Sequence, residues 1–445
     1  MDYYKIDKPD LNKINSEKTI KYILNNKDIR DSLESTYTPK YRYWDKIKYL
    51  QRPGNLSAEE FWLVVKFLRM NSSERYFTPI KDESGNYFSW QRLPGLSDFC
   101  HKIDLNMGGV LAVGKEHSQG YQKQLKIKGI IEEAIASSQL EGAHVTRSEA
   151  KEMIKENRKP TNKSEQMIFN NYKAILAIEN DYKERKLSKE LLLELHEVLT
   201  TKTLNEDEST RFRYDSDNII ISPENENIIY HKPPSENFML DQLQVLINYA
   251  NDETEEENFI HPVIKAILLH FWIGYLHPFT DGNGRIARAI FYWYLLRKNY
   301  WGFTRIPLSV KIKNSPVDYA MAYVYSEQDD NDLTYFIDYN FRKIELAIGD
   351  FDGFIDQLQK RQKYISNKLT DTHFNNRQIT LLNYFFNNEN AKTSIKTYSQ
   401  LHDVHRLTAR KDLLILLEHG FLHTKKVGRY VYYFATEKVA ELFDN

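Results

Sequence analysis

Twelve consecutive residues decide how this sequence is interpreted: His277-Pro278-Phe279-Thr280-Asp281-Gly282-Asn283-Gly284-Arg285-Ile286-Ala287-Arg288. An apolar stretch with helical periodicity, residues 264–276, precedes them, and Pro262 is suited to the first turn of that helix. A second helical stretch covers residues 286–296. The sequence therefore predicts two helices that are joined by a polar loop.

The loop is suited to holding a chain of phosphates. Gly282 and Gly284 permit a backbone turn with positive φ. The amides of Gly282, Asn283 and Gly284 then lie at the start of the second helix, where the helix dipole favours an anion. Arg285 and Arg288 are three residues apart, so they share a helix face and can clamp a polyphosphate. No Gly-Lys-Ser/Thr is present, so this loop differs from a Walker A motif.

Two more side chains of the loop can supply a metal ligand and a base. Asp281 offers a hard oxygen to Mg²⁺, which usually needs one or two carboxylates together with phosphates. His277 is the only group of the loop that titrates near neutral pH, so it is the natural general base. The residues alone thus predict a site for phosphate, Mg²⁺ and proton transfer. The alternative is an ordinary helix-loop-helix with a solvated basic face.

The pattern His-x-Phe-x-Asp-Gly-Asn-Gly-Arg-x-x-Arg resembles the signature of Fic domain proteins at every position. The resemblance implies a mainly α fold, a Fic-type helical bundle with a small β-hairpin flap. It also implies transfer of AMP from ATP, with Mg²⁺, to a Ser, Thr or Tyr hydroxyl of a target protein. His277 would then be the base, Asp281 would bind Mg²⁺, and residues 282–284 would form the anion hole. Arg285 would bind phosphate, and Arg288 would bind the γ-phosphate.

A second informative site lies upstream, at Ser137-x-x-x-Glu141-Gly142. Helical periodicity from residue 130 onward ends at Gly142, which is suited to the C′ position of a helix. Glu141 is a carboxylate near the negative end of that helix, so it needs a cationic partner. The run resembles the inhibitory motif of Fic proteins regulated in cis, in which the glutamate pairs with the second arginine of the signature, here Arg288. The resemblance implies that Glu141 keeps Arg288 from the γ-phosphate; an ordinary helix end is the alternative.

Residues 218–231 contain two β-branched runs around a Pro/Asn turn, which predicts a hairpin. The resemblance implies that this hairpin is a flap beside the active site. The backbone of the target would pair with Ile219, Ile220 and Ile221 by β-augmentation. A structural hairpin that covers the bundle is the alternative.

Some aromatic and histidine positions have two interpretations. Tyr319 and Tyr323 are candidates for the wall that receives adenine, by the resemblance, and core packing is the alternative. His196 and His270 lie on apolar helix faces, and we interpret them as buried core histidines rather than ligands.

Periodicity and composition divide the chain into four regions. Residues 1–115 are expected to form an aromatic-rich helical domain, in which Ser57 is an N-cap. Residues 116–345 would form the Fic domain with its inhibitory helix, and residues 346–375 a linking helix. Residues 376–445 resemble a winged helix-turn-helix, with three helices followed by a hairpin.

The partner of residues 376–445 is left open by the sequence. Ten basic side chains stand against seven acidic ones, a modest excess for a DNA-binding module. Arg410 and Lys411 on the third helix, with Arg429 in the wing, could meet DNA. The alternative is that an apolar face with Tyr432 and Phe434 docks against another subunit, as in a homodimer, or against the target.

Composition bounds the remaining possibilities. The formal net charge of the 445 residues is −1, so no global field attracts nucleic acid or an acidic membrane. The single cysteine, Cys100, excludes an intrachain disulfide and a zinc site built from cysteines, and we expect it to be buried. No apolar run approaches the roughly 20 residues of a membrane span. With no signal-peptide pattern at the start, the sequence predicts a cytoplasmic protein without a membrane partner.

Three functions are therefore compared. The first is adenylylation of a target protein, with self-modification of exposed hydroxyls as an additional expectation. The second is removal of AMP, in which Glu141 would position a water molecule. The third is a DNA-binding regulator whose Fic site senses a nucleotide. The intact base His277 argues against the third, because binding alone needs no base.

Overall fold

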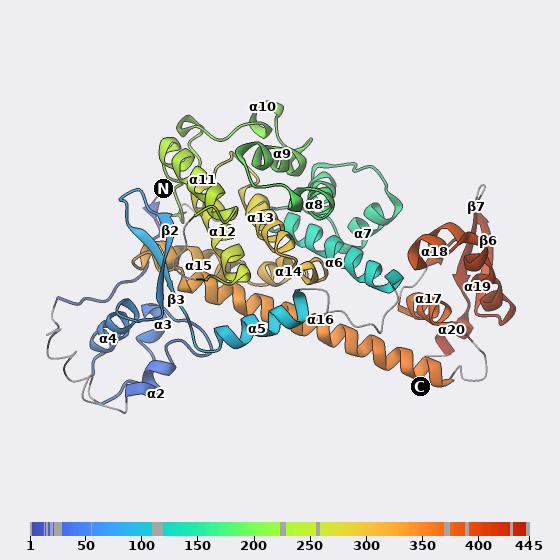
Figure 1. Cartoon of the computed structure of the whole chain (residues 1–445), viewed down its shortest axis with the longest axis horizontal. Helices are drawn as coiled ribbons and strands as arrows, with labels where there is room; N and C mark the ends of the chain where they lie inside the picture. The colour runs from blue at the N-terminus through green and yellow to red at the C-terminus, as the bar shows by residue number, and fades with distance from the viewer. Residues whose placement is uncertain are drawn as a thin grey trace. The chain divides into compact units, whose positions relative to one another are not determined.

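The computed structural model describes residues 2–12, 14, 17, 21, 29–54, 56–108, 119–222, 228–254, 259–368, 374–387, 391–427 and 430–441. The chain is mainly α-helical and divides into two compact units (Figure 1). Unit 1 comprises Met1–Ala112 and Ile130–Leu346, and unit 2 comprises Val113–Gly129 and Ala347–Asn445. Two long helices, α6 (Gln119–Leu140) and α16 (Thr334–Lys368), contribute residues to both units.

Unit 1 is built from helices and a few short strands. Its α-helices are α2 (Ile29–Glu34), α3 (Trp44–Ile47), α4 (Ala58–Met70), α5 (Leu96–Met107), α7 (Arg147–Glu156), α8 (Lys163–Asn180), α9 (Lys189–Thr200), α10 (Glu206–Ser209), α11 (Glu236–Ala250), α12 (Pro262–Leu276), α13 (Asn283–Arg297), α14 (Leu308–Lys313) and α15 (Pro316–Gln328). Its 3-10 turns are η1 (Tyr182–Glu184), η2 (Asp215–Asp217) and η3 (Trp301–Arg305). Its strands are β1 (Asp2–Tyr3), β2 (Arg75–Lys81), β3 (Tyr87–Gln91) and β4 (Ile228–Ile229).

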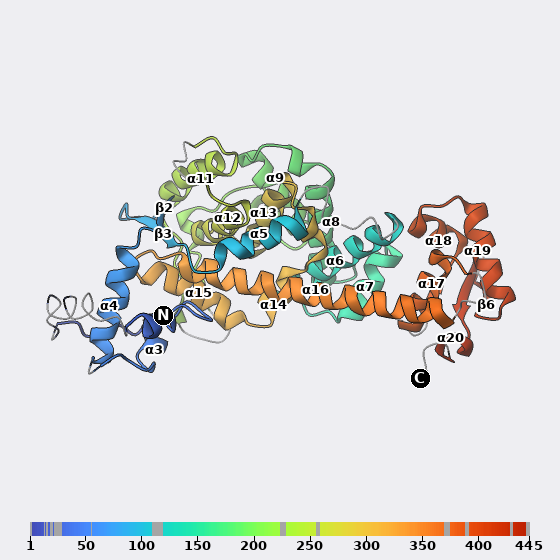
Figure 2. The same cartoon turned by 60° about the horizontal axis from the view of Figure 1, so that its bottom comes forward.

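The centre of unit 1 is the pair of helices α12 and α13, which lie side by side in Figures 1 and 2. Every residue of α12 from Val263 onward is buried except Gly274. A helix that is apolar on all sides belongs at the centre of a bundle. Helices α8 and α9 pack against α13, and α11 packs against α12. His261 caps α12. Pro262 occupies the first turn of the helix, as the sequence predicts.

The N-terminal part of unit 1 is only partly helical. Ser57 caps α4 in a capping box with Glu60, as the sequence predicts. The antiparallel hairpin of β2 and β3 is not predicted, because the sequence analysis assigned this region to helices alone. Gly85 turns the hairpin with a φ of 86°. The aromatic side chains pack with one another, and Tyr43 lies edge-on to Trp62 at 5.3 Å.

The flap differs from the hairpin that the sequence predicts. Its two arms meet at one antiparallel bridge, between Ile221 and His231. Strand β4 pairs instead with β1, in parallel. The turn at residues 223–227 lies outside the described residues. Strands of two residues carry too little periodicity for a sequence pattern to reveal such a pairing.

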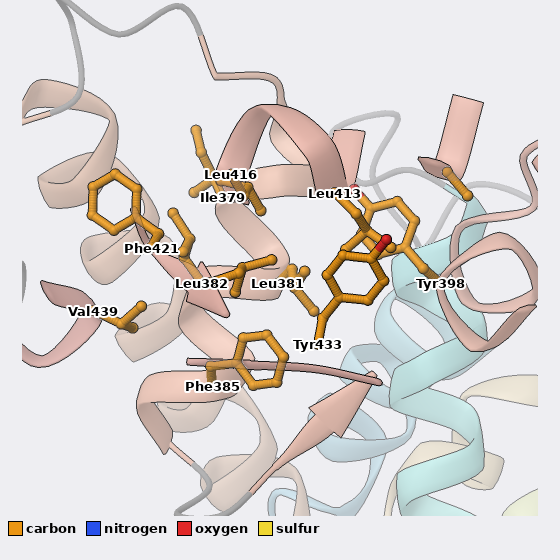
Figure 3. Close-up of a cluster of buried hydrophobic side chains, with 12 residues drawn as sticks. Ile379, Leu381, Leu382, Phe385, Tyr398, Leu413, Leu416, Phe421, Tyr433 and Val439 are labelled. Atoms are coloured by element: carbon orange, nitrogen blue, oxygen red, sulfur yellow. The ribbon is translucent and has the colours of Figure 1, made fainter. Parts of the chain in front are cut away.

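Unit 2 contains a small core of its own. The helices α17 (Asn376–Asn387), α18 (Ile395–His402), α19 (Arg406–Glu418) and α20 (Glu437–Glu441) accompany the strands β5 (Lys392–Thr393), β6 (Leu422–Val427) and β7 (Tyr430–Ala435). The sheet order is β5-β7-β6, with antiparallel neighbours. Leu382, Leu413 and Leu416 are fully buried in the cluster of Figure 3, beside Phe385 and Tyr433.

The helices and the hairpin that the sequence predicts for residues 376–445 are thus present, although Arg429 lies outside the described residues. The expected linking helix is part of α16, a continuous helix of 35 residues. In the described parts of both units, no helix is long and apolar enough to cross a membrane.

Candidate active site

The loop between α12 and α13 has a strained backbone at its first residue. His277 follows the last residue of α12 and adopts a left-handed conformation with a φ of 49°. For a residue with a Cβ atom this conformation costs on the order of 1 kcal/mol. Gly282, with a φ of 86°, makes the second left-handed turn and caps α13. The positive φ predicted for both glycines is confirmed at Gly282 and wrong at Gly284, which lies within α13, and the strain at His277 was not predicted.

Arg213 fixes the strained residue from outside the loop. Its Nε donates to the carbonyl of His277 at 2.8 Å, and its backbone N donates to the carbonyl of Pro278 at 2.9 Å. Its guanidinium also donates to the carbonyl of Pro234, and only 4% of Arg213 is exposed. Sequence reasoning missed this residue. Nothing in the local sequence distinguishes it from Arg211, which pairs with Asp217 near the surface.

The side chain of His277 is partly buried and neutral. Burial, aided by the positive charge of His231, lowers the pKa of His277 to about 3, so the imidazole is neutral. Nδ1 lies 3.3 Å from the carbonyl of Gly274 and donates to it. This tautomer leaves the lone pair of Nε2 available to accept a proton.

His231 is a second histidine beside the loop, and it is charged. Its Nδ1 lies 2.7 Å from Oε2 of Glu327, and its Nε2 lies 2.8 Å from the carbonyl of Tyr275. Burial opposes the charge, but Glu327 and the carbonyl outweigh it and raise the pKa of His231. Both ring nitrogens therefore donate. The sequence analysis assigned His231 to the hairpin only.

Gly282, Asn283 and Gly284, the residues predicted to form an anion nest, lie at the start of α13. The side chain of Asn283 is used for structure, because its Oδ1 accepts from the backbone N of Phe279 at 2.9 Å and its Nδ2 donates to the carbonyl of Phe279 at 2.8 Å. Phe279 is fully buried and stacks on His196 with ring centroids 3.8 Å apart. His196 is a core histidine as predicted, but its Nε2 also lies 2.9 Å from the carbonyl of Asp281.

Asp281 and Arg285 form the side of the nest that faces α9. Oδ1 of Asp281 accepts from the backbone N of Gly282 at 2.6 Å, and Oδ2 lies 3.2 Å from Nη2 of Arg285. Arg285 is 1% exposed and donates through Nη1 to the carbonyl of Leu199 at 3.0 Å. Its Nε is buried and has no hydrogen-bond partner among the described residues. A buried donor without a partner is costly, so this position fits an anionic group such as a phosphate.

Asp281 also fits the role of a metal ligand. Its side chain is 48% exposed, so one carboxylate oxygen can turn towards a cation. The described residues contain no group of three or more His, Cys, Asp or Glu that could hold a metal ion alone. Such a sparse site suits Mg²⁺, which is usually bound by one or two carboxylates together with phosphates.

Glu141 and Ser137 hold Arg288, the second arginine of the loop. Oε1 of Glu141 lies 2.8 Å from Nη2 of Arg288, and Nε of Arg288 donates to Oγ of Ser137 at 2.9 Å. Burial opposes the charge of Arg288, and Glu141 raises its pKa. A Cβ atom built on Gly284 would lie 2.3 Å from Oε1 of Glu141. The carboxylate therefore lies against Gly284, in the space that a side chain at this position would fill.

The end of α6 determines where Glu141 lies. Gly142 adopts a φ of 84°, the left-handed stop that the sequence predicts. The backbone N of Ala143 donates to the carbonyl of Ser138 at 3.0 Å. The backbone N of Gly142 donates to the carbonyl of Gln139 at 3.2 Å. Both bonds of a Schellman motif are present, so Glu141 is held at the C-cap, directly after the last residue of α6.

The remaining predicted residues make contacts of their own. The hydroxyl of Tyr319 lies 2.8 Å from Nε2 of His270, and the ring is edge-on to Tyr323 at 5.4 Å. The two arginines have different protein partners, because Arg285 donates to the carbonyl of Leu199 in α9 and Arg288 donates to Ser137 in α6. Of the flap residues, Ile221 makes the bridge to His231 and Ile220 is 40% exposed.

Comparisons with known proteins find relatives that are similar to part of this chain. Protein adenylyltransferase fic-1 of Caenorhabditis elegans is 30% identical over 121 residues, which are 27% of this chain and 22% of that protein. Protein adenylyltransferase Fic of Nematostella vectensis is 33% identical over 90 residues, 20% of this chain and 18% of that protein. The matches thus span about a fifth of the length of these relatives. A Fic family protein from Desulfovibrio desulfuricans G20 is similar in structure, with a TM-score of 0.49 and 19% identity over 78% of this chain and 97% of that chain.

The match to a family model includes the whole loop described above. Residues 186–295 match the Fic/DOC family. They run from the start of α9 through the flap and α12 to the last turns of α13. The part of the chain that holds this loop, residues 186–295, is therefore the part that matches the Fic/DOC family.

Proposed function

We propose that the chain is a protein adenylyltransferase, which transfers AMP from ATP to a Ser, Thr or Tyr hydroxyl of a target protein. The observation that carries the proposal is the loop at residues 277–288. It brings a neutral imidazole, a half-exposed carboxylate and a helix N-terminus flanked by two arginines to one place. The names of the curated relatives support the same activity, over the part of their length that matches.

The geometry suits a single displacement at the α-phosphorus of ATP. Nε2 of His277 takes the proton of the target hydroxyl, and the hydroxyl oxygen forms a bond to the α-phosphorus. The bond from the α-phosphorus to the oxygen that bridges to the β-phosphate breaks, and pyrophosphate leaves. The amides of the nest and Arg285 hold the phosphate oxygens. Asp281 would hold Mg²⁺, which supplies positive charge to the phosphates when bound.

We further propose that Glu141 holds the enzyme inactive. Arg288 cannot bind a γ-phosphate while it is paired with Glu141, and the carboxylate lies where an anion would approach Gly284. A charge-assisted pair of this kind contributes about 1.5–3 kcal/mol, which corresponds to roughly a 10- to 100-fold effect on productive binding. In the alternative function, removal of AMP, the same carboxylate would position a water molecule.

The direct test is labelling of a bacterial cell lysate with radioactive ATP. Glu141→Gly should label lysate proteins more strongly than the parent does, because Arg288 is released. Glu156→Gly, the same change at the exposed end of α7, is the matched control and should behave as the parent. If Glu141→Gly labels no more than the parent, the inhibitory role is wrong. If it instead loses the ability to remove AMP from labelled protein, the alternative function is favoured.

A second proposed function concerns the module at residues 376–445, interpreted as a winged helix-turn-helix. The first two turns of α19 expose Arg406, Arg410 and Lys411. The acidic residue of these turns, Asp412, is buried and paired with Arg377 at 2.8 Å. This basic face supports contact with duplex DNA. Self-modification, a homodimer and a cytoplasmic location stay predictions.

A further inference from the structure

The flap of the Fic domain is paired with the N-terminal segment of the same chain. Strand β1 runs parallel to β4, which is the second arm of the flap. The pairing continues past β1, because the backbone N of Tyr4 donates to the carbonyl of Ile229 at 2.9 Å. The ring of Tyr4 lies edge-on to Tyr230 at 5.1 Å. Residues 2–4 therefore close one edge of the flap.

The N-terminal segment is itself held by Gln328, the last residue of α15. Nε2 of Gln328 donates to the carbonyl of Tyr4 at 2.8 Å, and Oε1 accepts from the backbone N of Ile6 at 3.1 Å. A side-chain amide that donates and accepts along one extended segment reproduces the pairing of a neighbouring strand. Gln328 thus binds the backbone of residues 4–6 through both polar atoms of its side-chain amide.

The residue before Gln328 holds the same arm of the flap. Oε2 of Glu327 lies 2.7 Å from Nδ1 of His231, which is the residue that bridges the two arms. The backbone N of Ile221 donates to the carbonyl of His231 at 2.9 Å. The C-terminal end of α15 therefore holds the flap twice, directly at His231 and through residues 4–6.

The other edge of the flap has no such partner in the described part of the chain. Neither Ile219 nor Ile220 makes a backbone hydrogen bond to another described residue, and Ile220 is 40% exposed. Backbone groups at an unpaired edge can pair with an incoming extended segment.

We propose that residues 2–6 and Gln328 form a clamp that closes the β4 edge and fixes the flap, so that the backbone of a protein acceptor pairs with Ile219 and Ile220 at the opposite edge. The proposal rests on the proposed adenylyltransferase function. Gln328 is a positioning residue in this account. It acts on the acceptor through the flap, and it does not act on ATP.

The first experiment locks the clamp with a disulfide. In parallel strands, opposite residues are close enough for a disulfide, and Asp2 lies opposite Ile228. The only native cysteine, Cys100, is buried, and burial raises the pKa of its thiol to about 12, so it does not compete. In a Glu141→Gly background, Asp2→Cys with Ile228→Cys should label lysate proteins equally well before and after reduction. Loss of labelling in the oxidised form, restored by a reductant, would overturn the proposal. It would mean that β1 has to separate from β4 before a target protein can be modified.

The second experiment loosens the clamp and compares two acceptors. In the same background, Gln328→Ala should lower labelling of lysate proteins about 10-fold, as expected for the loss of one or two hydrogen bonds. Release of AMP from ATP into water should be unchanged, because water does not use the flap. Gln244→Ala, at an exposed glutamine of α11, is the matched control. Equal losses for protein and water would mean that Gln328 supports the fold in general, and would overturn the proposal.

Hydrogen exchange separates failure of the clamp from failure of the proposed function. Gln328→Ala should speed exchange of the amides of Tyr230 and His231, which donate to Ile221. Exchange in α12 and α13 should stay as in the parent. Unchanged exchange at Tyr230 and His231 would overturn the clamp, whether or not AMP is transferred. If the Glu141→Gly protein with an intact clamp labels nothing, the proposed function fails instead.

Discussion

His277 combines, at the scale of one residue, a strained backbone with a neutral side chain. Its left-handed φ turns the chain directly after α12, and its pKa of about 3 leaves Nε2 unprotonated at neutral pH. Strain of this kind persists only where the surroundings enforce it, and here Arg213 binds the carbonyl of the strained residue. The backbone of His277 is therefore fixed by Arg213, and its imidazole is kept neutral by burial.

Replacing His277 tests its role as the base. Asn tolerates the left-handed conformation better than most residues, so His277→Asn removes the base while it keeps the turn. In a Glu141→Gly background, transfer should fall about 10²- to 10⁴-fold. ATP affinity, measured by calorimetry, should be retained. Retained transfer by this variant would assign the base to another group.

Buried histidines also predict how stability depends on pH. Burial lowers the pKa values of His270 and His277 to about 3 each, whereas an unfolded histidine has a pKa of about 6.5. Below pH 6.5 the unfolded state therefore binds protons that the folded state does not bind. Stability should be complete above pH 6.5 and decrease as the pH falls towards 3.

Melting temperatures at pH 7 and pH 5 measure this effect. His270→Gln removes one of the two groups, so its melting temperature should fall less between these pH values than that of the parent. His101→Gln, at an exposed histidine of α5, is the control and should fall as the parent does. An equal fall in His270→Gln and the parent would contradict the account.

The helices and their ends show how much of the site the sequence predicts. The ends of helices follow from local residues, so Ser57, Gly142 and Pro262 mark them correctly. The pairing of Arg288 with Glu141 is also found where the sequence places it. These features depend on neighbours in sequence or on a motif of fixed spacing.

Contacts that join distant segments were not predictable. Arg213 contacts His277 across 64 positions, and β1 pairs with β4 across more than 200. Both depend on how the chain folds back, and neither leaves a periodic pattern. The nest at α13 was predictable because its glycines and arginines are adjacent in sequence.

A substitution of Arg213 tests the importance of these contacts between distant segments. Arg213→Lys keeps the charge but loses the planar fork that reaches the carbonyls of His277 and Pro234 together. Leaving a buried carbonyl without a donor costs about 1–3 kcal/mol. Denaturant unfolding should show a loss of this size, and transfer in the Glu141→Gly background should fall. Arg211→Lys is the matched control, and equal behaviour of the two variants would remove Arg213 from the site.

At the scale of the whole molecule, unit 1 contains the region that matches the Fic/DOC family, and unit 2 contains the module at residues 376–445. The salt dependence of DNA affinity tests whether the partner of this module is DNA. If α19 meets DNA through Arg406, Arg410 and Lys411, three phosphate contacts give a log–log slope of affinity against salt near −2.7. A gel shift with the full chain should show this slope, and Arg410→Ala with Lys411→Ala should reduce it. Labelling of lysate proteins should be unaffected. Absence of DNA binding at moderate salt would favour a protein partner for this face.

The central claim is that Glu141 restrains the enzyme through Arg288. The most direct measurement is incorporation of AMP by the parent, Glu141→Gly, Arg288→Ala and the double variant. Because the two side chains act as one unit, their effects should not be additive. We expect Glu141→Gly to gain activity and the double variant to lose that gain. A double variant as active as Glu141→Gly would contradict the account, because Glu141 would then act without Arg288.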